Sequence, residues 1–273
     1  MPRCIYFLVF GIGMLGAAIA QGPAPQSEKD AFLAAIHRTS PEAKAEALES
    51  FLNKFPESEL KERSLEILLE TYWQLQRFPK FGNTLDELLK VNPDNLLGLT
   101  VKAESRCDNE SLGLCEKEET DIANRGLRVL ATATKPADVS KEDFVSLKAR
   151  SSFVFHRTLG NWALNHHDYQ GAQVNLRTAA EIDPTNFATV YPLALAYLNS
   201  KPPNNVQGLF FIARAPSLLN SNGKFQKQLV DYGKREYVKY HGSEVGWLEL
   251  LQSAKNTPLP TAEFTITPAS INP

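Results

Sequence analysis

The sequence has no surplus of charge of either sign. Its 273 residues include 29 lysines and arginines against 31 aspartates and glutamates, a formal net charge of -2. Binding to nucleic acid or to an anionic membrane surface is favoured by clustered positive charge. The near balance gives no such footprint, so we expect neither nucleic acid nor a membrane surface as a partner.

Signatures of catalysis are also missing. The chain contains no G-x-S-x-G turn, no phosphate-binding glycine-rich loop, no H-E-x-x-H motif and no C-x-x-C motif. Paired carboxylates such as Glu118 and Glu119 do occur, but on amphipathic helices such pairs usually belong to solvated faces. We therefore expect a protein that is not an enzyme and uses no cofactor. An enzyme of unrecognised type is the alternative.

Cysteine is scarce. Of the three cysteines, Cys4 precedes the apolar N-terminal run, while Cys107 and Cys115 share the segment RCDNESLGLCEKEE, which is predicted as a loop between helices. Two neighbouring thiols in an oxidising compartment more often pair than stay free. A Cys107–Cys115 disulfide is therefore predicted. The alternative is a metal site, but it would need further ligands, and no histidine lies nearby in the sequence.

Long apolar runs are confined to the N-terminal segment MPRCIYFLVFGIGMLGAAIA. Arg3 supplies a positive charge, an apolar run follows it, and Ala18 and Ala20 form the small-x-small pattern of a cleavage site. The run is about 16 residues long, short of the roughly 20 that a spanning helix needs. Residues 1–20 are therefore predicted as a secretory signal peptide cleaved after Ala20. The mature chain is then secreted or periplasmic and not stably inserted in a membrane; a retained anchor is the alternative.

Alternation of apolar and polar residues, which marks a half-buried strand, is almost absent. Apolar residues recur instead at helical spacing, which predicts an all-α protein. The expected helices cover residues 28–37, 41–55, 58–76, 78–91, 95–107, 116–133, 140–166, 168–182, 187–199, 205–219, 223–241 and 244–255.

Prolines end several of these helices. Pro56, Pro93 and Pro184 each follow a helical run, and proline both lacks an amide hydrogen and disfavours the α conformation of the residue before it. The side-chain oxygens expected to cap the next helices are those of Ser40, Asp94 and Thr185. Short helices in antiparallel order cannot each bury an apolar face alone, and stacking them produces a solenoid.

One helical pair matches a repeat motif. Leu159-Gly160 fit the Leu-Gly pair of a first helix, Pro184 closes the unit, and the second helix carries Ala172, Leu176 and Ala179. Residues 153–186 thereby resemble a tetratricopeptide repeat, a helix-turn-helix unit of about 34 residues. His156 and Ala163 depart from the bulky and aromatic positions of that family. Weaker copies extend the resemblance over residues 40–220, which implies a right-handed superhelical solenoid of antiparallel helix pairs.

The segment LGNWALNHHDYQGAQ predicts a turn between the two helices of this unit. Gly160 and Ala172 are small where the helices are expected to cross. His166 and His167 occupy the turn, and Asp168 is placed to cap the second helix. Consecutive histidines point in different directions, whereas chelation on one helix face usually uses residues four apart. The pattern therefore favours a helical turn over a metal site.

Proteins of this family usually bind peptides or partner proteins in a concave groove lined by the first helix of each pair. The residues that the resemblance assigns to this groove are Arg157, Asn161, Leu164 and Asn165 in one repeat, and Tyr191, Leu195 and Asn199 in the next. Arg157 with Asn161 resembles part of a carboxylate clamp, although Pro192 stands where that clamp has another asparagine. A solvated helix face is the alternative for each of these residues.

The three tryptophans suggest a different function, because flat aromatic faces stack on sugars. Trp162 and Trp247 are predicted to belong to the core, whereas Trp73, beside Tyr72, is a candidate for ligand contact in the groove. A carbohydrate-binding or cell-wall-binding module is therefore the alternative function.

The predicted organisation is a signal peptide (1–20), a linker (21–27), tetratricopeptide-like repeats (28–222), capping helices (223–255) and an extended or disordered tail (256–273). The predicted function is a non-catalytic scaffold of the cell envelope or secreted space that binds a peptide or a partner protein in its groove.

Overall fold

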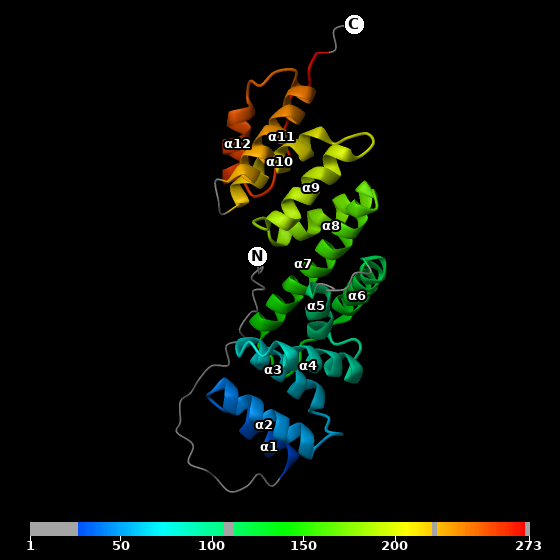
Figure 1. Cartoon of the computed structure of the whole chain (residues 1–273), viewed down its shortest axis with the longest axis vertical. Helices are drawn as coiled ribbons and strands as arrows, with labels where there is room; N and C mark the ends of the chain where they lie inside the picture. Colours follow the sequence, from blue (N-terminus) through cyan, green and yellow to red (C-terminus); the bar gives the residue numbers. More distant parts are fainter. Residues whose placement is uncertain (1–26, 106–111, 220–222, 271–273) are drawn as a thin grey trace. The chain divides into compact units, whose positions relative to one another are not determined.

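Regular structure in the described part of the chain is entirely helical, which confirms the predicted all-α class (Figure 1). The computed structural model describes residues 27–105, 112–219 and 223–270, with no side chains described for 112–116. The predicted signal peptide, most of the predicted linker and Cys107 lie outside these residues, as does the side chain of Cys115. Cleavage after Ala20 and the Cys107–Cys115 disulfide therefore stay predictions.

The helices follow the predicted pattern closely. In chain order they are α1 (Glu28–Ile36), α2 (Pro41–Lys54), α3 (Lys61–Gln74), α4 (Phe78–Val91), α5 (Leu96–Glu104), α6 (Leu112–Thr132), α7 (Lys141–Asn165), α8 (Tyr169–Ile182), α9 (Phe187–Asn199), α10 (Asn205–Arg214), the 3₁₀ turn η1 (Ala215–Leu218), α11 (Lys224–His241) and α12 (Trp247–Asn256). Three starts differ from the prediction by three or four residues, and α3 begins at Lys61 where residue 58 was predicted. The helix α6 begins earlier, so Cys115 lies in a helix and not in a loop. The helix α12 begins only after Gly246, whose φ of 88° is outside the right-handed helical region.

Side-chain oxygens cap several helices, but two of the four predicted caps, Asp94 and Thr185, are wrong by one residue. Ser40 accepts a hydrogen bond from a first-turn amide of α2, as predicted. Asp94 and Thr185 do not precede their helices directly; Asn95 caps α5, and Asn186 holds the corresponding position before α9. The reason is that the residue after each proline is still part of the turn, where its amide donates to the side chain two residues earlier.

The chain divides into two compact units. Unit 1 is drawn from Met1–Ser105 and Arg128–Lys148, and unit 2 from Arg106–Leu127 and Ala149–Pro273. The helices α6 and α7 therefore each contribute residues to both units.

In unit 1 the helices α1 to α5 pack in sequence order, each against the next. Two apolar clusters result, and α3 takes part in both because it is buried on two sides. Its residue Leu68 joins Leu48 and Phe51 in the cluster between α1, α2 and α3, whereas Leu65 and Leu69 join the cluster formed with α4 and α5. A helix that is apolar on two faces links one layer of the stack to the next.

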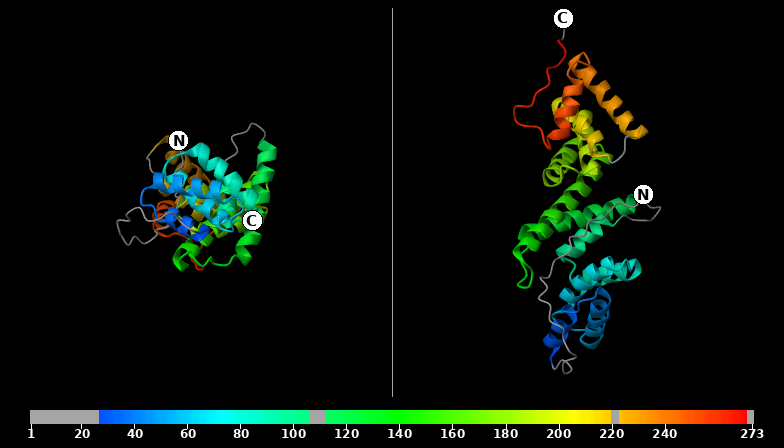
Figure 2. Two further views of the ribbon diagram at one scale, coloured as in Figure 1. Left: turned by 90° about the horizontal axis from the view of Figure 1, so that it is seen from below. Right: turned by 90° about the vertical axis from the view of Figure 1, so that its left-hand side faces the viewer.

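In unit 2 the core is a single larger cluster built from α8 to α12 and the end of α7. The helix α10 lies at its centre, since every residue from Gly208 to Arg214 is buried. The helix α9 packs on both α8 and α10, and α10 also packs on α11 and α12. Residues 257–270 follow α12 without regular structure and run beside it (Figure 2).

Small residues lie where the paired helices of unit 2 meet. A Cβ atom added to Gly160 would lie 2.6 Å from Cγ of Leu176, and one added to Gly208 would lie 2.7 Å from Cγ of Leu198. A fully buried alanine, Ala172 or Ala194, lies in the other helix of each pair. The predicted crossing at Gly160 is therefore confirmed, and the pair α9–α10 uses the same combination of one glycine and one alanine.

Candidate functional site

Four aromatic side chains of α9 and α11 form a row in unit 2, the aromatic row hereafter: Phe187, Tyr191, Phe225 and Tyr232. The rings of Phe187 and Tyr191 are stacked, with centroids 5.5 Å apart and an interplanar angle of 6°. Phe225 meets Phe187 edge-on at 6.0 Å, yet half of it, 50 %, is exposed. The other three side chains are half-buried and pack against the core. An exposed aromatic ring that contacts another ring is typical of interaction surfaces.

Helical spacing explains why these rings share one side. Phe187 and Tyr191 are four residues apart on α9, and Phe225 and Tyr232 are seven apart on α11, so each pair lies on one face of its helix. Another face of α11 is buried, where Tyr237 belongs to the core cluster of unit 2.

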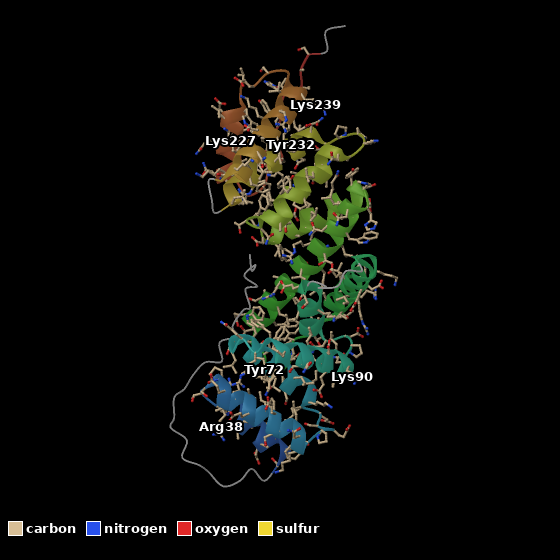
Figure 3. All side chains as sticks on the ribbon, in the orientation of Figure 1. Arg38, Tyr72, Lys90, Lys227, Tyr232 and Lys239 are labelled. Atoms are coloured by element: carbon tan, nitrogen blue, oxygen red, sulfur yellow. The ribbon has the colours of Figure 1, made fainter. Side chains whose placement is uncertain are left out.

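The electrostatic surroundings of the aromatic row are asymmetric. The helix α9 (FATVYPLALAYLN) carries no charged residue, whereas α11 carries an excess of lysine and arginine. Lys224, Arg235 and Lys239 are exposed along one flank of α11, interrupted by the exposed Asp231. Tyr232 and Lys239 of this helix are labelled in Figure 3. The guanidinium carbon of Arg235 lies 5.8 Å from the ring of Tyr232.

Burial raises the pKa of Tyr232, and the negative charge of Glu236 and the neighbouring Tyr191 raise it further, against the opposing effect of Arg235. The hydroxyl of Tyr232 therefore stays protonated and able to donate a hydrogen bond at physiological pH. The row thus offers flat apolar rings, hydroxyl donors and a basic flank.

The structure places only part of the predicted groove set in this row. Tyr191 belongs to it, and Leu195 is half-buried one turn further along α9. On α7 the guanidinium of Arg157 lies over the ring of Phe153 at 5.0 Å. The other predicted residues divide by exposure: Asn161 and Leu164 are half-buried, and Asn165 and Asn199 are exposed at the last positions of α7 and α9. Trp73 belongs to unit 1, whereas all of these belong to unit 2.

Sequence reasoning missed Phe187, Phe225 and Tyr232. The helix α11 was expected only to cap the stack, so the seven-residue spacing of Phe225 and Tyr232 was not used in the prediction. That spacing, together with the lysine and arginine residues beside it, is the signal that would have identified a second helix of the face.

Of the two tryptophans predicted to lie in the core, one is buried and the other is exposed. Trp247 is 2 % exposed, which confirms its predicted place in the core. The prediction for Trp162 is wrong, because 37 % of it is exposed and His166 stacks on it at 4.3 Å. The small residues Gly160 and Ala163 occupy the buried side of α7 here and leave Trp162 on its outer side. Trp73 is half-buried and meets the ring of Phe81 at 5.5 Å.

The turn between α7 and α8 has the predicted form. His166 and His167 directly follow α7, and Asp168 caps α8 by accepting a hydrogen bond from the amide of Gly171 at 2.9 Å. This turn and the loop from Ser200 to Asn204 line an open hollow of about 1140 Å³. Within the described residues, no three His, Cys, Asp or Glu side chains lie close enough together to hold a metal ion.

Unit 1 contains a cluster of charged side chains along α3. The guanidinium of Arg63 pairs with Glu66 at 2.8 Å and with Asp138 at 2.7 Å. Glu70, one turn beyond Glu66, is partly buried, and burial is the main cause that raises its pKa from 4.5 to about 8. The negative charges of Glu66 and Asp143 raise that pKa further, while Arg63 and Lys44 lower it. A carboxyl group that keeps its proton at neutral pH can act as an acid.

Glu70 is expected to make unit 1 less stable as the pH rises. The unfolded chain releases this proton near pH 4.5 and the folded chain near pH 8, so the folded state holds more protons between those values. The stabilisation is complete below pH 4.5 and is lost as the pH rises towards 8. In Glu70→Gln, the fall in the free energy of unfolding between pH 5 and pH 8 should shrink by about 1 to 2 kcal/mol, allowing for solvent screening. Urea unfolding at both pH values measures it, and an unchanged slope would show that Glu70 titrates normally.

No helix in the described residues combines the length and the apolar character that crossing a membrane requires. Comparisons with models of known protein families, with curated proteins and with solved structures find no match to this chain.

Proposed function

We propose that this chain is a non-catalytic, secreted or periplasmic scaffold that binds a peptide segment of a partner protein. In this proposal the helices stack as a tetratricopeptide-like, right-handed solenoid of antiparallel pairs. The partner contacts the first helices of successive pairs in unit 2, namely α7, α9 and α11. The signal peptide that the sequence predicts at residues 1–20 is the reason for proposing this compartment.

The observation that carries the proposal is the aromatic row. Phe187 contacts Tyr191 on its own helix and Phe225 on α11, yet Phe225 keeps half of its surface exposed. Burying such a surface under a partner gains free energy at about 25 cal/mol for each Å² of apolar area. Aromatic side chains also carry a large share of the binding energy in protein interfaces. The row is therefore the part of unit 2 best suited to partner binding.

The recurring helix crossing supports the solenoid. The pairs α7–α8 and α9–α10 each place one glycine and one buried alanine in facing helices. Consecutive helices in unit 1 also pack each against the next. Contacts of this kind between neighbours in sequence are characteristic of repeat proteins.

The charges around the aromatic row indicate which residues the bound peptide should carry. The face has no acidic or basic group on α9 and a basic flank on α11. A matching segment has aromatic residues or prolines that lie against the rings, with acidic residues beside them. A scaffold of this type requires no reacting group in the chain itself.

The double variant Tyr191→Ala, Phe225→Ala is expected to lose peptide binding. A displayed random-peptide library is selected on the mature chain, and the affinity of each selected peptide is then measured by fluorescence anisotropy. Loss of the two rings should weaken binding at least tenfold, which corresponds to about 1.4 kcal/mol.

The matched control is Phe78→Ala, because Phe78 is an aromatic of similar exposure, 55 %, that lies in unit 1. Its affinity for the selected peptides should equal that of the unchanged chain. Failure to select any peptide, or equal affinities for the double variant and the unchanged chain, would contradict binding through the aromatic row.

A further inference from the structure

The C-terminal tail, residues 257–270, lies on unit 2 in the manner of a bound peptide. It has no regular structure and leaves α12 at Thr257, whose carbonyl oxygen accepts a hydrogen bond from Nη1 of Arg214 at 2.9 Å. The root of the tail is thereby fixed. From Thr261 to Glu263 the chain is exposed.

Two alternate side chains hold the tail beyond this exposed stretch. The ring of Phe264 meets that of Phe210 edge-on at 5.2 Å, and Phe210 is itself a core residue with 1 % exposure. Ile266 is 9 % exposed, while Thr265 and Thr267 on either side of it are exposed. Burial of every second residue is the pattern of an extended peptide seated on a surface.

Hydrogen bonds to the main chain of the tail hold it at the C-terminal end of α11. The carbonyl oxygen of Thr267 accepts a hydrogen bond from Nδ1 of His241 at 2.7 Å. The amide of Ala269 donates to the carbonyl oxygen of Tyr240 at 2.8 Å. Both hydrogen bonds involve only backbone groups of the tail, so an extended segment of another sequence could form them as well.

The tail does not fill the space available to it. An open hollow of about 460 Å³ remains between residues 264–267 and the helices α11 and α12, lined by Tyr237, Leu250 and Ser253 among others. At this end of unit 2, Val245 and Leu248 are 73 % and 74 % exposed. The seat is therefore larger than the segment that occupies it.

We propose that this seat, the tail channel, is a peptide-binding site distinct from the aromatic row, and that the tail occupies it as a tethered competitor. The external ligand is an extended segment of a partner protein with an aromatic residue two positions before an aliphatic one. That pattern is the one of Phe264 and Ile266. The partner segment replaces the tail residues beyond the exposed stretch, while Arg214 keeps the root in place.

A tethered segment competes at a high effective concentration, of the order of millimolar for a short flexible linker. The unchanged chain is therefore expected to bind an added peptide weakly. Releasing the tail should reveal the intrinsic affinity of the channel.

The test uses the full chain with Phe264→Ser and Ile266→Ser, which removes both anchors without shortening the tail. The probe is a labelled synthetic peptide with the sequence of residues 260–270, PTAEFTITPAS, and the readout is fluorescence anisotropy. We expect the peptide to bind the double variant at least tenfold more tightly than the unchanged chain. A peptide with serine at both anchor positions should not bind, and His241→Ala added to the double variant should weaken binding severalfold.

Three results would overturn the proposal. Absence of binding to a folded double variant, judged by circular dichroism, removes the channel as a peptide site. Loss of the folded state in the double variant shows that the tail belongs to the core and is no ligand. A dimer of the unchanged chain in light scattering that becomes monomeric in the double variant identifies the occupant as a second copy of the chain.

Discussion

Replacing Arg214 by methionine is expected to lower the free energy of unfolding by about 3 to 5 kcal/mol, the largest single-residue effect that we predict. Arg214 is 5 % exposed. Its guanidinium donates to main-chain carbonyl oxygens of Pro184 at 3.0 Å, of Ala254 at 2.9 Å and of Thr257 at 2.9 Å. Methionine preserves much of the volume but leaves these buried acceptors without a donor.

The cost is high because Arg214 joins three parts of unit 2. It extends from the end of α10 to the turn between α8 and α9 and to the C-terminal end of α12, where the helix dipole favours a positive charge. Burial lowers the pKa of Arg214, but the guanidinium remains charged at every physiological pH.

Urea unfolding of the unchanged chain, Arg214→Met and Arg214→Lys measures the effect. Lysine keeps the charge but not the planar fork of donors. The free energy of unfolding of Arg214→Lys should therefore lie between those of the unchanged chain and Arg214→Met. A change below about 1 kcal/mol for the methionine variant would mean that solvent satisfies the carbonyl oxygens after all.

The second large effect is expected for Gly160→Leu, which should destabilise unit 2 by about 3 kcal/mol. A Cβ atom at this position would lie 2.6 Å from Cγ of Leu176 and 3.0 Å from its backbone nitrogen. The backbone of α8 cannot move aside without disturbing the packing around Ala172, which is fully buried. The side chain therefore forces the two helices apart.

Gly82→Ala is the matched control, because a Cβ atom there would meet nothing within 4 Å. It replaces a glycine inside α4, so it should stabilise the chain by about 0.5 to 1 kcal/mol. Thermal unfolding followed by circular dichroism should show opposite shifts for the two variants. Equal shifts, or no shift for Gly160→Leu, would argue against a close helix crossing at this glycine.

The turn at His166 and His167 and the helices themselves could be predicted because they depend on neighbours in the chain. Proline ends a helix through its own ring, and the apolar residues of a helix recur at a fixed spacing. Even the two wrong caps, Asp94 and Thr185, missed by a single residue. Local interactions of this kind leave a direct record in the order of residues.

The side that each residue faces was harder to predict. Trp162 was assigned to the core because it neighbours the predicted crossing positions, but the crossing at Gly160 places small residues on the buried side of α7 and leaves Trp162 on the outer side. Only one of the four residues of the aromatic row was predicted. Tyr191 was recognised through its place in the repeat, whereas Phe225 and Tyr232 belong to a helix outside the recognised repeats.

The sequence by itself determined that the chain is all-α, where each helix begins and ends to within a few residues, and where the hairpin turn between α7 and α8 lies. Only the tertiary structure decided that Arg214 reaches a carbonyl group 43 residues away, that Phe187 meets Phe225, and that the tail returns to α11. The physical reason is the separation in sequence between the residues that interact. Helix formation is governed by bonds between residues four apart, whereas these contacts depend on how complete helices pack, which no local pattern records.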